Sequence, residues 1–208
     1  MNEDPSSSEP PRTANLNARE QLDKLFLDVE SRAHGVMRRD GRLSPTLFAV
    51  SPGGLSVYAP GPVNEVPEKN DFAAVARLIC AAQAVTAVVL AVEAWVLEAK
   101  PGQRLDLFTR PSQSPDRKEY LCLLGESQGG TCHQKLLPIL RDPRGRFACL
   151  GLAKVLPPEP AEGRFGRLLP QTPLTGEVRA FAASMLESRG LVLAGAPHGN
   201  QSQAAGRG

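Results

Sequence analysis

Apolar residues recur every three or four positions in three parts of the chain, which predicts three helices. Their expected extents are residues 17–35, 70–84 and 175–188. The first should begin near Asn17, because Asn17 and Glu20 have the spacing of a capping box, and it should stop at Gly35. Residues 59–68 contain three prolines and should form a connecting loop. Most of the remaining apolar positions alternate with a period of two residues, as in strands.

Six segments are rich in β-branched and alternating apolar residues, which predicts strands. Their expected extents are residues 46–50, 55–58, 86–97, 118–126, 133–140 and 147–156. Turn sequences that contain Gly and Pro separate the first two strands and the last three, as in antiparallel hairpins. The segment 86–97 is apolar on both alternating faces, which is typical of a central strand that is covered on both sides.

The resulting order α, ββ, α, ββββ, α predicts an α+β fold. Its sheet should be mainly antiparallel, a hairpin plus a four-stranded meander, packed with about three helices. The length of 208 residues suits a single domain, which we place at residues 16–193. The polar segments 1–15 and 194–208 should be disordered tails, because they contain too few apolar residues to form a core.

Composition narrows the class of protein. Hydrophobic residues make up 41% and charged residues 22%, which excludes wholesale disorder, and the net charge of +2 does not by itself indicate a nucleic-acid partner. The longest apolar stretch, 15 residues between Arg77 and Glu93, is shorter than the roughly 20 that cross a membrane. The chain starts with an acidic, Pro- and Ser-rich segment instead of a secretion signal, so we expect a cytoplasmic protein with reduced thiols.

Motifs for common chemistries are missing from the sequence. The four cysteines lack the close pairs of a zinc site, and no Gly-x-Ser-x-Gly elbow is present, so we expect neither a metal nor a cofactor. Cys132 and His133 are neighbours on an expected strand, where they should point to opposite faces. Glu98 and Lys100 have the Glu-x-Lys spacing of metal-dependent nucleases, but an Asp should precede that strand and here Asp116 follows it.

Arginines gather in three turns and are candidates for contact with nucleic acid. They are Arg38, Arg39 and Arg42, then Arg141, Arg144 and Arg146, then Arg164 and Arg167. If the three turns converged on one face they could bind phosphates, because guanidinium groups match phosphate oxygens in pairs. Otherwise they are solvated loop charges. No aromatic platform for stacked bases accompanies them.

The most distinctive feature is Glu93 with Trp95 on the expected central strand. A carboxylate on an apolar strand must be paired, protonated or open to a cleft. Arg117, at the start of the next strand, is its expected partner, with Ser112 and Asp116 capping the turn before it. Two interpretations follow. Glu93, Trp95, Ser112 and Arg117 form a structural cluster, or Glu93, Asp116, Arg117 and Glu119 form a binding or catalytic cluster, with or without a divalent metal.

These segments resemble a family of short, uncharacterised proteins of bacteria and their phages or plasmids. The shared pattern is Glu-Ala-Trp on a strand (residues 93–95), then Pro-Ser-x-x-Pro-Asp-Arg-x-Glu at the start of the next (residues 111–119). The resemblance covers residues 88–124. Many members carry His where this chain has Ser114, which argues against a catalytic or metal-binding role of the segment here. The family has no known activity, so the resemblance implies an origin and no function.

Function therefore stays a set of hypotheses. The leading one is a non-enzymatic cytoplasmic binding or accessory protein, of phage or mobile-element origin, with a protein partner and no membrane association. The first alternative is an enzyme that uses the carboxylate and arginine cluster around Glu93 and Arg117. The second is a nucleic-acid-binding protein that uses the arginine-rich turns.

Overall fold

The computed structural model describes residues 17–61, 63, 65–98, 111–161 and 163–192. Within them the chain forms three α-helices, one short 3₁₀ helix and a seven-stranded sheet. In chain order these are α1 (Ala18–Asp40), β1 (Thr46–Ser51), β2 (Gly54–Tyr58), α2 (Val66–Ala82), β3 (Ala87–Val96), η1 (Pro111–Gln113), β4 (Lys118–Ser127), β5 (Cys132–Arg141), β6 (Phe147–Leu150), β7 (Lys154–Val155) and α3 (Gly176–Glu187). The α+β prediction is confirmed. The expected tails lie outside the described residues.

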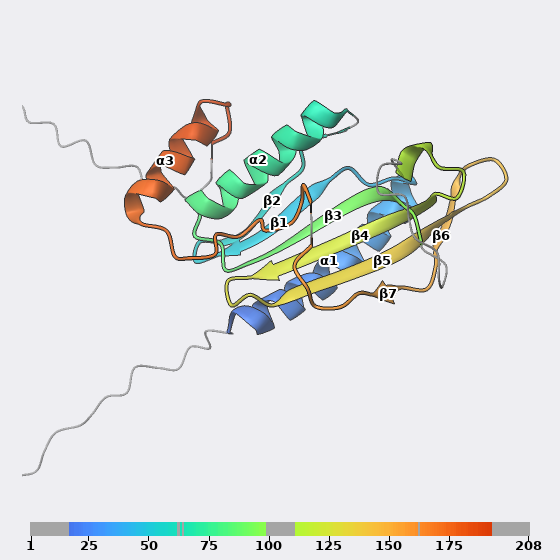
Figure 1. Cartoon of the computed structure of the whole chain (residues 1–208), viewed down its shortest axis with the longest axis horizontal. Helices are drawn as coiled ribbons and strands as arrows, with labels where there is room; N and C mark the ends of the chain where they lie inside the picture. Colours follow the sequence, from blue (N-terminus) through green and yellow to red (C-terminus); the bar gives the residue numbers. More distant parts are fainter. Residues whose placement is uncertain (1–16, 62, 64, 99–110, 162, 193–208) are drawn as a thin grey trace, which may run out of the picture.

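The sheet is antiparallel throughout and has the order β2-β1-β3-β4-β5-β6, with β7 also paired to β5. It therefore combines the expected hairpin with the expected meander. Helices α2 and α3 lie on one face of the sheet and α1 runs along the other (Figure 1). The two faces carry separate apolar cores.

Strand β3 takes part in both cores, because its side chains alternate between the two faces. Val88, Leu90 and Val92 face α2 and α3, whereas Ala87, Val89 and Ala91 face α1. All six side chains are buried. The prediction of a central strand covered on both sides is thus confirmed for residues 87–92, and the covering ends just before Glu93.

Helix α1 continues past Gly35, where it was expected to stop. Met37 extends the buried stripe of the helix and is 0% exposed, so the burial gained by another turn outweighs the roughly 1 kcal/mol that an internal glycine costs. The helix ends at Gly41, whose positive φ of 69° lets its N–H bond to the Met37 carbonyl. Arg38 and Arg39 accordingly belong to the last helical turn and not to a loop.

Helix α2 begins within the segment that was expected to be a loop. Glu65 and Glu68 form a capping box, and Pro67 stands in the first turn, where a helix tolerates proline because no N–H is needed there. The last expected strand, residues 147–156, is divided into β6 and β7. Both pair with β5, and the register shifts between Leu140 and Arg141.

Two residues at the end of β4 hold the layers together. A Cβ atom at Gly125 would lie 3.0 Å from side-chain atoms of Leu22 and Phe26, so glycine is needed for the close approach of α1. On the other face the buried Glu126 carboxylate accepts hydrogen bonds from the Leu168 and Leu169 N–H groups, at 2.9 and 3.2 Å. Glu126 thereby fixes the segment that leads to α3.

Candidate binding groove

Glu93 lies where the α1 face of the sheet begins to open. Its carboxylate accepts a hydrogen bond from the Leu43 N–H, in the segment that joins α1 to β1. Partial burial raises the pKa of Glu93, and the nearby Glu119 raises it further, while the Leu43 hydrogen bond, Arg141 and Arg42 lower it. Glu93 therefore acts mainly as an acceptor that holds the backbone at Leu43.

Arg117 is not the partner of Glu93, which corrects the expected ion pair. Its guanidinium carbon lies 4.8 Å from the centre of the Trp95 ring, and its Nη1 donates to the Ser112 carbonyl at 2.6 Å. The strand register explains the error. Trp95 pairs with Glu119 and Val96 with Lys118, so Arg117 lies about four residues from Glu93 along the sheet, roughly 13 Å.

The partner of Arg141 is Glu119, which faces the same side of the sheet as Glu93. The two Glu119 oxygens accept from Nε and Nη2 of Arg141, both at 2.6 Å. A third Arg141 nitrogen donates to the Gly41 carbonyl at 3.1 Å. The Glu119–Arg141 pair therefore ties β4 and β5 to the end of α1, next to the residue that Glu93 holds.

The candidate catalytic residues do not meet in one cleft. Glu93 and Glu119 each accept from the donors just named, Arg117 lies over Trp95, and Asp116 is exposed in a turn where its N–H bonds to the Ser114 hydroxyl. No cluster of three or more His, Cys, Asp or Glu side chains that could hold a metal occurs in the described part of the chain. Cys132 and His133 point to opposite faces, since His133 contacts Asp23 on α1 and Cys132 donates to Gly130.

Two of the three arginine turns meet, and the third lies elsewhere. Arg141 bonds to Gly41, which brings the end of α1 next to the β5–β6 turn. Arg164 lies on the opposite face, where it donates to Asn70 on α2. Within the first two turns Arg39 pairs with Asp40 and Arg146 with Asp142, so much of their charge is neutralised locally.

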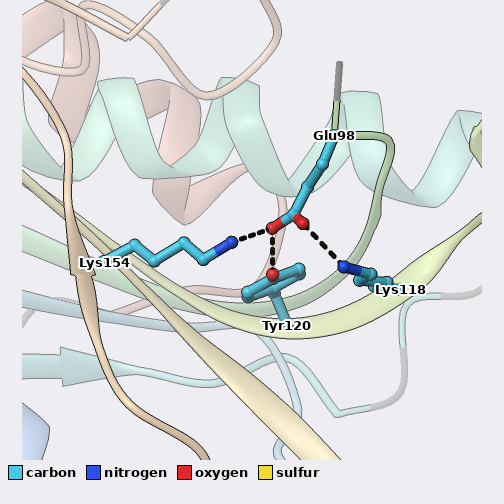
Figure 2. A network of polar contacts seen from close by, with 4 residues as sticks. All are labelled: Glu98, Lys118, Tyr120 and Lys154. Carbon is cyan, nitrogen blue, oxygen red and sulfur yellow. Dashed lines mark hydrogen bonds and ion pairs between the residues drawn. The ribbon is translucent and has the colours of Figure 1, made fainter. Parts of the chain in front are cut away.

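A separate polar network lies at the end of β3, on the face of the sheet that α2 and α3 cover. The Glu98 carboxylate accepts from Lys118 at 2.7 Å and also from Tyr120 and Lys154 (Figure 2). The hydrogen bond from Lys118 is the largest of the effects that lower the pKa of Glu98 to about 2, followed by those from Lys154 and Tyr120. With three donors on one carboxylate, the network links the end of β3 to β4 and β7. Lys100, its expected companion, lies outside the described residues.

A concavity lies between α1 and the β1–β2 hairpin, beside the segment that Glu93 and Arg141 hold at Leu43 and Gly41. We call it the α1–hairpin groove, with a volume of about 580 Å³. Its apolar lining consists of Ala33, Val36, Leu43, Phe48 and Val57. Its charged lining consists of Arg32, Arg39, Asp40 and Arg42. The volume falls in the usual range for ligand sites, and the combination of apolar and basic side chains suits a ligand that has both apolar and anionic parts.

The charge of the groove is positive. Arg39 and Asp40 form a hydrogen-bonded pair at 2.9 Å, and the bond from Arg39 lowers the pKa of the Asp40 carboxyl. Arg32 and Arg42, in contrast, form no ion pair or hydrogen bond with any other residue that the structure describes. Two guanidinium groups are thus available to an anion at the edge of an apolar surface.

Glu93 and the Glu119–Arg141 pair support one wall of the groove. Glu93 holds the Leu43 N–H and Arg141 holds the Gly41 carbonyl, so the segment that carries Arg42 is fixed at both sides. The feature that the sequence singled out is therefore close to the groove and shapes it, although Glu93 and Trp95 are not among its lining residues.

Sequence reasoning identified Arg42 and Arg39 and missed the rest of the groove. Arg32 and Arg39 are seven residues apart on α1, and Val36 lies between them at helical spacing, so all three share one flank of the helix. That spacing was visible in the sequence. The position of the hairpin next to this flank was not, because it depends on how α1 crosses the sheet.

Comparisons with known proteins add no assignment. No family model, curated protein or solved structure matches the chain. Among the described helices, none is both long enough and apolar enough to cross a membrane.

Proposed function

We propose that this chain is a non-enzymatic binding or accessory protein, and that its ligand occupies the α1–hairpin groove. The ligand would be amphipathic, with an apolar part against Phe48 and Val57 and a negative charge near Arg32 and Arg42. The observation that carries this proposal is that Arg32 and Arg42, which form no ion pair with a described residue, line one concave surface together with the exposed Val57.

A cytoplasmic location and an origin in bacteria or their mobile elements remain part of this proposal. The four free cysteines are consistent with a reducing compartment, and the Glu-Ala-Trp segment carries the family resemblance. The enzymatic alternative is less favoured, because Glu93 and Glu119, two of the three carboxylates it would use, already accept hydrogen bonds from structural donors. The nucleic-acid alternative is less favoured because Arg39, Arg141 and Arg146 are paired with neighbouring carboxylates.

Titration with anilinonaphthalene sulfonate, a fluorescent dye with an apolar body and one negative charge, tests the proposal. We expect saturable binding of one dye per chain, weakened at least fivefold in the double variant Arg32→Gln/Arg42→Gln. The matched control is Arg38→Gln, which removes one charge from the same helix outside the groove and should leave the affinity unchanged. Equal binding by the wild type and the double variant, with circular dichroism showing both to be folded, would refute the groove as the ligand site.

A further inference from the structure

Strand β2 forms one edge of the described sheet, and it lacks the usual features that protect an edge strand. It pairs with β1 on one side, and no described strand pairs with the other. Its sequence, Gly54–Tyr58, contains no charge, proline or bulge, which are the usual devices that prevent an edge strand from pairing with another chain. The opposite edge of the sheet is different, since it ends in two short strands, a register shift and the charged Lys154.

The backbone groups at that outer edge belong to Leu55 and Val57. The Val50 carbonyl bonds to the Thr86 N–H at 2.8 Å, so the backbone of Val50 points away from β2. Leu55 is the register partner of Val50, and hydrogen-bonded and non-bonded pairs alternate along an antiparallel ladder. The N–H and carbonyl groups of Leu55 and Val57 therefore point outward, whereas those of Ser56 point to β1.

The side chains of the same two residues lie on the groove side of the hairpin. Val57 pairs with Phe48 and Leu55 with Val50, and this face of the hairpin is the one turned toward α1. Val57 lines the groove and is 52% exposed, and Leu55, nearer the hairpin turn on the same face, is 51% exposed, so neither apolar side chain is covered. On the other face Tyr58 stacks on Phe72 with ring centres 5.8 Å apart, which holds the strand in place.

From these features we infer that β2 accepts an extended segment of a partner protein as an additional antiparallel or parallel strand, a mode that rests on the proposed function of the groove. The segment pairs with the backbone of Leu55 and Val57, and alternate side chains enter the groove. Those side chains are apolar over Val57 and acidic near Arg32 and Arg42. The partner is thus an extended acidic and apolar peptide segment.

A second copy of this chain is a less suitable occupant. Antiparallel pairing of two β2 edges around a twofold axis would place the grooves of both copies on the same side of the joined sheet. Arg32, Arg39 and Arg42 of both copies would then add positive charge to the same face of the joined sheet, and this like charge would not favour the contact. An acidic segment would instead be attracted by these arginines.

The probe is a blocked eight-residue peptide, Thr-Glu-Thr-Val-Thr-Val-Thr-Glu. Its threonines lie on one face of an extended strand, and its glutamates and valines lie on the other. Two versions of it carry N-methyl groups, one on the amides that would face β2 and the other on the amides that would face solvent. Since only alternate amides of an added strand bond to the edge, one methylated peptide should bind at least tenfold more weakly and the other about as well as the parent. Hydrogen exchange of the full chain should show new protection at Leu55 and Val57 and none at Ser56.

The possible results distinguish a failure of strand addition at β2 from a failure of the groove as a ligand site. If the parent peptide binds, and Arg32→Gln/Arg42→Gln weakens it, but both methylated peptides bind equally, strand addition is wrong and the groove remains a binding site. If the peptide does not bind and the dye does not depend on these arginines, the proposed function fails with it. A peptide-free dimer in sedimentation, with Leu55 and Val57 already protected, would assign the edge to a second copy and overturn the inference.

Discussion

The two faces of the β1–β2 hairpin differ sharply in how they are covered. On the α2 side Leu47 and Ala49 are 1% and 0% exposed, because α2 packs across them. On the α1 side Phe48 of β1 is also buried, but Leu55 and Val57 of β2 are about half exposed, because α1 lies over β3 and β4 and only its flank approaches the hairpin. The closed face contributes stability to the fold. The open face has exposed apolar side chains, and across the groove from it lie Arg32 and Arg42, which form no ion pair with a described residue.

The largest expected effect is a difference in stability between substitutions on the closed and the open face of the hairpin. Leu47→Ala should destabilise the chain by about 2–5 kcal/mol, since it leaves a cavity in a closed core. Val57→Ser, on the open face of the same hairpin, should change stability by no more than about 0.5 kcal/mol. Urea unfolding of both variants measures the difference. A loss for Val57→Ser as large as that for Leu47→Ala would mean that the open face is covered in the native protein.

A smaller effect concerns how the stability of the fold depends on pH. Glu93 and Glu98, near the end of β3 and on opposite faces of the sheet, should change it in opposite directions. Burial raises the pKa of Glu93, so the folded state holds this proton more tightly than the unfolded state does. Its contribution to stability therefore grows as the pH falls from the raised value toward the ordinary 4.5. The pKa of Glu98 is lowered to about 2, so its contribution is present above about pH 4.5 and is lost as the pH falls toward 2.

Unfolding midpoints measured across acidic pH should consequently respond in opposite directions. Glu93→Gln should remove a stabilisation that develops on acidification, while its amide oxygen still accepts the Leu43 N–H. Glu98→Gln should flatten part of the acid-side loss, with a modest amplitude because the Glu98 network is solvent-exposed. Shifts of the same sign in both variants would contradict the assigned environments of the two groups.

Much of the fold followed from local patterns. The period of Leu22, Phe26 and Val29 predicted α1, and the two apolar faces of residues 87–92 predicted a strand between two layers. The errors arose where contacts between residues distant in the sequence determine the structure. Gly35 did not end α1, because the burial of Met37 depends on the sheet below it, and β2 could not be recognised as an unprotected edge before the strand order was known.

The candidate site was predictable only in part, for the same reason. Glu93 was correctly identified as a carboxylate that needs a partner, but its partner is a backbone N–H fifty residues earlier in the chain, which no side-chain pattern reveals. Arg117 was the expected partner because it stands at the start of the next strand, and the strand register places it over Trp95 instead. Registers depend on turn lengths and packing together, so a shift of a few residues is enough to exchange partners.

Reversal of the groove charge is the most direct test of the central claim that the open face binds an acidic, apolar ligand. Two peptides that alternate threonine with charged and valine residues, one with glutamates and one with lysines, are titrated into the wild type, Arg32→Glu/Arg42→Glu and the control Arg38→Glu. We expect the wild type and the control to prefer the glutamate peptide at least tenfold and the double variant to prefer the lysine peptide, with both preferences reduced by salt. An unchanged preference in the folded double variant would contradict the account.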